Sequence, residues 1–125
     1  MLPMSEYKHQ EITSKIINSS HTVHNTLGCG FLEKVYHKSL VIELEKRGLL
    51  VESEKSVEIK YDNQIVGEYF ADIVVDNKVI VEVKAVSEYN AIFEAQLLNY
   101  LKVMHLEVGL IINFGPSVQI KRMVL

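Results

Sequence analysis

Apolar residues recur along three parts of the chain with a period of three to four, which predicts helices. Residues 6–26 place Ile12, Ile16 and Val23 on one face, and residues 31–47 repeat the pattern. The glycines between these two segments and the glycine after the second are typical of helix ends. Residues 89–104 show the same period, so we expect a third helix there.

The remaining apolar segments are short and alternate or run continuously, which predicts strands. Residues 56–61, 65–75 and 79–86 are separated by the turn signals Asp-Asn-Gln and Asp-Asn-Lys, which favours an antiparallel meander. The continuous apolar run 108–114 is typical of a strand covered on both faces, and 117–125 predicts a last edge strand. The order α-α-β-β-β-α-β-β predicts an α/β (α+β) fold with a mixed central sheet flanked by helices.

Length and composition are those of one globular domain, residues 1–125, in which 48% of the residues are hydrophobic. No apolar run approaches the roughly 18 residues of a membrane span, and the first ten residues lack the pattern of a secretory signal. We therefore expect a cytoplasmic protein that does not bind membranes. Cys29 is the only cysteine, which excludes an internal disulfide and a cysteine-built metal site. The net charge of −3 argues against non-specific coating of nucleic acid but is compatible with a local groove or an acidic metal site.

Three charged residues stand inside strands that are otherwise apolar. Glu82 and Lys84 are two residues apart in the segment 79–86, so they point to the same side of that strand. Asp72 is the lone acid in the last half of the preceding strand, and a turn centred on Asn77 places it opposite Glu82. Since burying such charges is costly without compensation, we expect the three side chains to share a purpose.

Two convergent carboxylates form a hard-oxygen site suited to Mg²⁺ or Mn²⁺, and a neighbouring lysine can position or deprotonate a water. This combination fits metal-assisted hydrolysis of a phosphodiester. The alternative is that Glu82 and Lys84 form a solvent-facing ion pair on an edge strand, because Glu-x-Lys is a common tripeptide. Asp72, at a compatible register, favours the metal site.

Two further groups of polar residues lie on predicted helices. Gln96 and Tyr100 are four residues apart and share a helical face, although Tyr100 also fits simple core packing and Gln96 an exposed surface position. Gly30, Glu33 and Tyr36 follow one another at spacings of three, along one stripe of the second helix. Taken alone, this stripe indicates a core position for Tyr36 and a surface position for Glu33.

Together these residues resemble the PD-(D/E)XK nuclease superfamily in its RecB-like arrangement: Asp72, then Glu-Val-Lys at 82–84, then Gln96-x-x-x-Tyr100. The segment Gly-Phe-Leu-Glu-Lys-Val-Tyr at 30–36 more closely matches the GxxExxY family of small bacterial and archaeal proteins. The resemblance extends over nearly the whole chain, from His24 to Arg122. It implies a restriction-endonuclease-like αβββαβ core, here with an extra N-terminal helix.

The resemblance also implies roles for individual residues. Asp72 and Glu82 would be the central ligands of Mg²⁺ or Mn²⁺, and Glu33 would be the helix-borne acid that completes the metal shell. Lys84 would be the catalytic lysine that assists the attacking water. Gln96 would be a catalytic residue close to the substrate.

Four accessory positions follow from the same comparison. Tyr100 would act beside Gln96, Gly30 would permit a close approach of the second helix, and Tyr36 would pack or hydrogen-bond behind Glu33. His24 occupies a position where the family commonly has histidine, and a capping or packing role near the helix end is its equal alternative.

The function implied is a metal-dependent nuclease acting on DNA or RNA, with DNA preferred. The alternative is a non-catalytic module that binds nucleic acid or protein and retains the nuclease fold, which the acidic net charge favours. The short chain is compatible with a homodimer or a protein partner, and the last strand is one candidate interface. A small-molecule hydrolase has little support, since the chain has neither a nucleophile elbow nor a phosphate-binding glycine loop.

Overall fold

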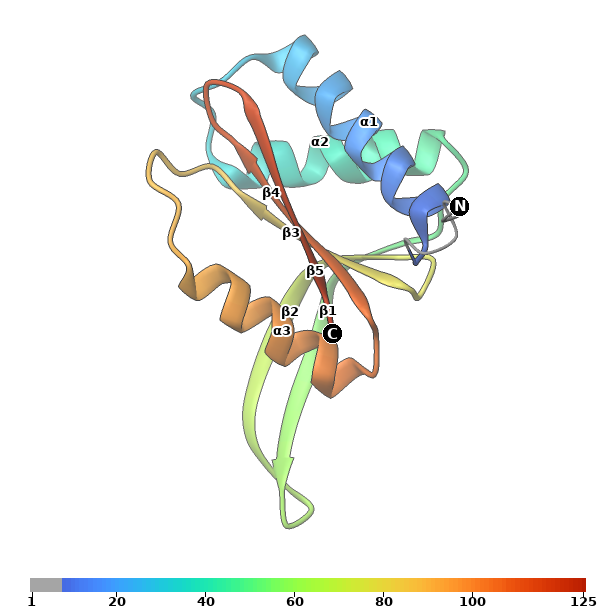
Figure 1. The fold of residues 1–125 in the computed structure, drawn as a ribbon, viewed down its shortest axis with the longest axis vertical. Coiled ribbons are helices and arrows are strands. Elements are labelled where there is room, and N and C mark those ends of the chain that lie inside the picture. The colour runs from blue at the N-terminus through green and yellow to red at the C-terminus, as the bar shows by residue number, and fades with distance from the viewer. Residues whose placement is uncertain (1–7) are drawn as a thin grey trace, which may run out of the picture.

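The computed structural model describes residues 8–125, which form three helices and a mixed sheet of five strands (Figure 1). The helices are α1 (Gln10–Leu27), α2 (Glu33–Lys46) and α3 (Ile92–Met104). The strands are β1 (Val51–Tyr61), β2 (Gln64–Val75), β3 (Val79–Lys84), β4 (Val108–Phe114) and β5 (Val118–Val124). Both the order of the elements and the fold class predicted from the sequence are confirmed.

The sheet runs in the order β1-β2-β3-β4-β5, with an antiparallel meander at one end. The parallel strands β3 and β4 are joined by the crossover helix α3, and β5 pairs antiparallel with β4 at the edge. All seven residues of β4 are buried, as expected for a strand covered on both faces.

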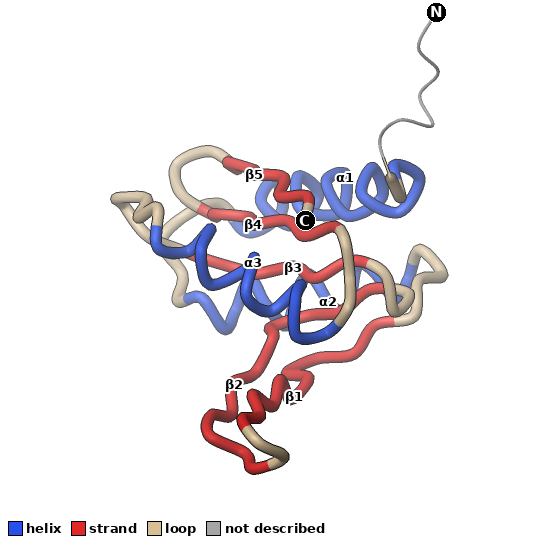
Figure 2. The backbone as a smooth tube through the Cα atoms, turned by 60° about the horizontal axis from the view of Figure 1, so that its bottom comes forward, coloured by secondary structure: helices blue, strands red, loops and turns tan. Residues whose placement is uncertain are grey.

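Helices α1 and α2 cover one face of the sheet and α3 covers the other (Figures 1 and 2). Ile16, Tyr36 and Leu40 therefore pack against one set of strand residues, and Leu97 and Leu101 pack against the other. This three-layer arrangement buries the apolar stripe of each helix.

The close packing of α3 depends on a glycine in β4. A Cβ atom added to Gly109 would lie 2.8 Å from the Cδ atoms of Leu97, well inside van der Waals contact. The absence of a side chain at this position therefore lets the crossover helix lie directly on the central strands.

Some element boundaries differ from the prediction. Strand β1 begins at Val51, because residues 51–55 pair with β2 although they are mostly polar. Helix α3 begins at Ile92 and not at residue 89, because the Oδ1 atom of Asn90 accepts a hydrogen bond from the Ile92 amide and forms a turn first. The predicted start of the first helix, at residue 6, lies outside the described residues.

The hairpin of β1 and β2 extends beyond the rest of the sheet as a projecting arm (Figures 1 and 2). Its tip residues Asp62 and Asn63 have φ values of 52° and 60°, the left-handed conformation of a type I′ turn. Asp76 and Asn77 adopt the same conformation between β2 and β3, which confirms both turn signals. Within residues 8–125, no helix has the length and apolarity that crossing a bilayer requires.

Candidate functional site

The strands β2 and β3 separate at the point where the two predicted carboxylates lie. Their pairing ends at Ile73 opposite Val81, in the register that the sequence predicted. One residue further, the Asp72 amide donates a hydrogen bond to Oε2 of Glu82 at 2.9 Å. The Val83 amide donates to Oδ2 of Asp72 at 2.8 Å. The two side chains thus bind the backbone of each other's strand across a fork in the sheet.

A backbone distortion in β1 marks the same level of the sheet. Glu54 has a φ of 54°, which is uncommon for a residue other than glycine. The pairs on either side of it, Ser53 with Ile73 and Lys55 with Ala71, keep one register, so Glu54 lies opposite Asp72. Strained residues of this kind cluster at functional sites, which supports the fork as the centre of the site.

Negative charge on the two carboxyl groups at the fork is unfavourable. Glu82 is only 5% exposed, and burial together with the nearby charge of Asp72 raises its pKa to about 8. Burial also raises the pKa of Asp72, although the hydrogen bond from the Val83 amide opposes this change. A carboxylate pair with this electrostatic balance favours a bound cation, and carboxylate oxygens are the donors that Mg²⁺ and Mn²⁺ prefer.

Lys84 and Glu33 approach the fork from β3 and α2. The Nζ atom of Lys84 lies 4.5 Å from the ring centroid of Phe93, and its charge lowers the pKa of both Asp72 and Glu82. Glu33 is the first residue of α2, at the rim of the site, and partial burial and then the charge of Asp72 raise its pKa. Among residues 8–125, no three His, Cys, Asp or Glu side chains are grouped closely enough to hold a metal ion. Hydrogen bonds connect Asp72 and Glu82 to each other's strand, whereas Glu33 interacts with these two residues electrostatically.

Tyr36 fixes the turn from which α2 begins. Its hydroxyl donates to the Gly28 carbonyl at 2.7 Å and accepts a hydrogen bond from the Phe31 amide at 3.3 Å. Its buried ring stacks on Phe114 at 4.7 Å between centroids. Tyr36 therefore holds the segment that positions Glu33.

The role predicted for Gly30, to permit a close approach of the second helix, is wrong. A Cβ atom at this position would meet nothing within 4 Å, so no close approach of the helix depends on the missing side chain. Its φ of 104° lies instead in a region that side chains rarely allow. Gly30 is needed for the conformation of the turn.

The helix α3 presents Gln96 and Tyr100 on the face that covers the sheet. The Nε2 atom of Gln96 donates to the Tyr100 hydroxyl at 2.9 Å. Burial, followed by the charge of Glu82, raises the pKa of Tyr100, which places the phenol within reach of the fork. His24, in contrast, contacts the Gly115 carbonyl at 2.8 Å and ties α1 to the turn after β4.

Two other residues near the fork were missed in the sequence. The Nε2 atom of His37 lies 2.7 Å from Oγ of Ser53, and the charge of this imidazole lowers the pKa of Glu33 and Asp72. Its position four residues after Glu33 was a usable signal, because such residues share a helical face. No sequence pattern pointed to Glu54.

Asn113 holds the end of β3 behind Lys84, with which it is paired in the sheet. Its Oδ1 atom accepts from the Val86 amide at 2.9 Å, and its Nδ2 atom donates to the Val86 carbonyl at 3.0 Å. The side chain is buried, so its role is to fix the strand end.

Two clefts are lined by predicted site residues. One, of about 580 Å³, is lined by Glu33, Phe31 and Ala85, and a second, of about 240 Å³, is lined by Gln96 and Tyr100.

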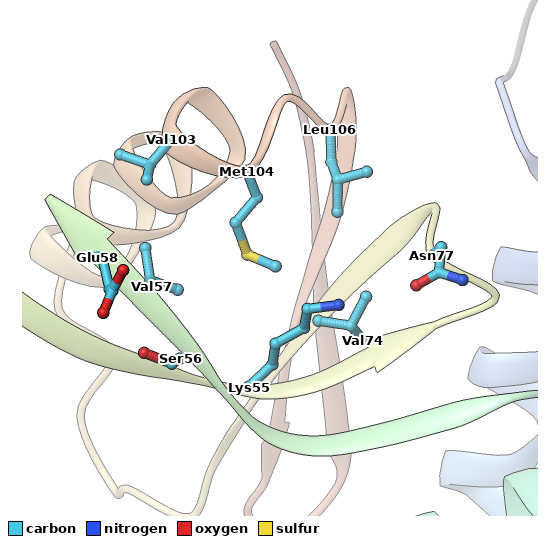
Figure 3. Close-up of a pocket in the computed structure, with 9 residues that line it drawn as sticks. All are labelled: Lys55, Ser56, Val57, Glu58, Val74, Asn77, Val103, Met104 and Leu106. Carbon is cyan, nitrogen blue, oxygen red and sulfur yellow. The ribbon is translucent and has the colours of Figure 1, made fainter.

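A further cleft of about 620 Å³ contains none of the predicted site residues. It lies between β1 and the end of α3, where Met104 and Leu106 face Lys55 and Val74 (Figure 3). The predicted chemistry is therefore not in the most spacious of these three clefts.

Comparison with known proteins identifies the family of this chain. The sequence model of the PD-(D/E)XK nuclease superfamily matches residues 10–123. The chain belongs to this superfamily, which confirms that part of the resemblance. A search of curated proteins finds no match.

A search of solved structures finds the crystal structure of SSO0001, which is similar in fold. The superposition has a TM-score of 0.55 at 20% sequence identity and covers 74% of this chain. The chain spans 50% of the length of that protein. The likeness supports the arrangement of strands and helices described above.

Proposed function

We propose that this chain is a divalent-metal-dependent nuclease that hydrolyses phosphodiester bonds in nucleic acid, with DNA as the preferred substrate. Its membership of the superfamily supports a nuclease, and PD-(D/E)XK nucleases are generally dependent on divalent metals. The observation that carries the proposal is the fork, where the half-buried carboxylate of Asp72 and the buried carboxylate of Glu82 lie within electrostatic reach of Lys84.

Asp72 and Glu82 would hold Mg²⁺ or Mn²⁺, with Glu33 contributing from the rim. Hydrogen bonds already fix Oδ2 of Asp72 and Oε2 of Glu82, so the side chains are oriented before any ligand arrives. A divalent ion, when bound, supplies positive charge that offsets the charge developing on the phosphate. Such preorganisation lowers the cost of assembling the transition state.

The hydrolysis forms a bond between a water oxygen and phosphorus, and the bond from phosphorus to the leaving oxygen breaks. The water releases a proton to solvent and the leaving oxygen takes one up. Lys84 would position the water and stabilise negative charge on the phosphoryl oxygens. Its alternation in β3, which puts it on the same face as Glu82, supports this role. Gln96 would contact the substrate, with its amide held by the Tyr100 hydroxyl.

A second candidate is a non-catalytic module that binds a protein. The observation that favours it is the projecting hairpin, which exposes Tyr61, Ile65, Val66 and Phe70. An exposed apolar surface of this kind is typical of interaction sites.

A cleavage assay separates the two functions. Labelled single-stranded, duplex and branched DNA and RNA are incubated with Mn²⁺ and the purified chain. The proposal predicts cleavage that disappears with a chelator and in Glu82→Gln. Cleavage that persists in Glu82→Gln would contradict the assignment of the reaction to this site. Absence of cleavage by the wild type with every substrate would contradict the nuclease and favour the binding module.

A further inference from the structure

A pocket lies between the projecting hairpin and α3, beside the fork. Its volume is about 240 Å³. Residues from both elements form its walls: Ile59, Tyr69, Ile92, Gln96, Asn99 and Tyr100. No sequence pattern pointed to this pocket, because its walls come from distant segments.

The walls combine an accessible aromatic ring, aliphatic side chains and two carboxamides. Tyr69 is 47% exposed, and its ring centroid lies 6.1 Å from that of Tyr100. Ile59 and Ile92 add apolar surface, and Ile92 is 64% exposed at the mouth. Gln96 and the exposed Asn99 each carry a hydrogen-bond donor and an acceptor.

This chemistry matches an unpaired nucleobase. Single-stranded nucleic acid is recognised by stacking of bases on aromatic side chains and by hydrogen bonds to their edges. A base within a duplex offers neither an open face nor a free Watson–Crick edge. The ring of Tyr69 and the two carboxamides supply the complementary groups.

The pocket shares two residues with the proposed site, Gln96 and Tyr100. Gln96 and Tyr100 line it and also form the hydrogen bond at 2.9 Å next to the fork. The charges of Glu82 and Asp72 both influence the pKa of Tyr100, so the pocket and the carboxylates are neighbours. A base held here would leave the adjoining backbone beside Asp72 and Glu82.

The walls of the two clefts lined by predicted site residues offer stacking surfaces and carboxamides and no basic side chains for binding phosphates. Neither of the two clefts has a lysine or arginine among the residues that line it. Recognition of a duplex relies on basic groups that contact the phosphates of both strands. Stacking is therefore the recognition chemistry that these walls provide.

We propose that this pocket receives one unpaired base of the substrate, so that the chain acts on single-stranded or locally unpaired nucleic acid. This inference rests on the proposed function, since it specifies the substrate of the same site. Tyr69 would stack on the base, and Gln96 and Asn99 would bind its edge.

Fluorescence anisotropy with labelled oligonucleotides tests the pocket separately from catalysis. The probes are a short single-stranded DNA, the RNA of the same sequence, and the blunt duplex, each with Ca²⁺ in place of Mn²⁺. The single strand should bind more tightly than the duplex. Tyr69→Ala should weaken single-strand binding roughly 5- to 150-fold, the range for loss of one stacked base. Tyr69→Phe, which retains the ring, should bind like the wild type.

Two matched controls separate the pocket from general effects on the surface. Tyr61 is an exposed tyrosine (78%) at the tip of the same hairpin, so Tyr61→Ala should leave binding unchanged. Ile92→Glu places a repelling charge at the mouth on an exposed position and should reproduce the loss even if Tyr69→Ala does not fold. Ile42→Glu changes an exposed isoleucine of α2 in the same way and should have no effect.

The outcomes distinguish this inference from the proposed function. Binding that is equal in Tyr69→Ala and the wild type, or equal for duplex and single strand, would overturn the pocket even if Mn²⁺-dependent cleavage were present. Tyr69-dependent binding of the single strand without cleavage by the wild type would support the pocket and contradict the nuclease. A wild type that binds none of the three probes would overturn both.

Discussion

The substitution Glu82→Gln should stabilise the metal-free protein at neutral and higher pH. Glutamine removes the buried charge but retains an oxygen that can accept the hydrogen bond from the Asp72 amide. In the wild type this amide donates to Oε2 of Glu82 at 2.9 Å. The pKa of Glu82 rises from 4.5 to about 8 through burial and the charge of Asp72. At about 1.4 kcal/mol for each tenfold change in proton affinity, ionising this group in the folded state costs up to roughly 5 kcal/mol.

The sign of the pH dependence follows from this difference. Between pH 4.5 and about 8 the unfolded chain releases the proton of Glu82 while the folded protein retains it. The free energy of unfolding therefore falls as the pH rises through this window, since the unfolded state binds fewer protons. Below the window the contribution is fully present, and above it the contribution is lost.

Urea denaturation followed by circular dichroism measures the effect across this window in the presence of a chelator. The wild type should lose stability as the pH rises, and the slope should be smaller in Glu82→Gln. Glu45→Gln, at an exposed position of α2, serves as the control and should follow the wild type. Equal slopes in the wild type and Glu82→Gln would refute the electrostatic account of the fork.

Three further substitutions have defined outcomes. Lys84→Ala should reduce Mn²⁺-dependent cleavage by about 10²-fold or more while Mn²⁺ binding remains, and equal cleavage rates would remove Lys84 from the reaction. Tyr36→Phe breaks the hydrogen bonds to Gly28 and Phe31, so urea denaturation should show a loss of about 1–3 kcal/mol, and an unchanged midpoint would be inconsistent with this role. Gly109→Ala forces a methyl group to within 2.8 Å of Leu97 and should cost about 1–3 kcal/mol in the same assay, whereas a neutral result would show that α3 can move away.

The sequence was sufficient to predict the elements and the register of the meander. Two short turns of Asp and Asn separate the strands, and a short turn fixes which residues face one another. The acids in apolar strands were conspicuous for a related reason, because burial of a charge is costly and indicates a use. Asp72 and Glu82 could thus be selected before their contacts were known.

The fork itself could not be predicted in the same way. Alternation of side chains implies a continuous ladder, whereas here the carboxylates of Asp72 and Glu82 bind backbone amides where the ladder ends. The left-handed conformation of Glu54 has no sequence signal, since glutamate rarely adopts it. The pocket at Tyr69 could not be predicted from the sequence either, because it depends on how the hairpin is inclined toward α3.

The central claim is that Asp72 and Glu82 hold a divalent metal, and calorimetric titration with Mn²⁺ tests it most directly. The titration compares the wild type with Asp72→Asn and Glu82→Gln, and Glu45→Gln serves as the control. The account predicts saturable binding in the wild type and the control, and its loss in both site variants. Binding of Mn²⁺ by both site variants with the affinity of the wild type, or no binding by the wild type, would contradict it.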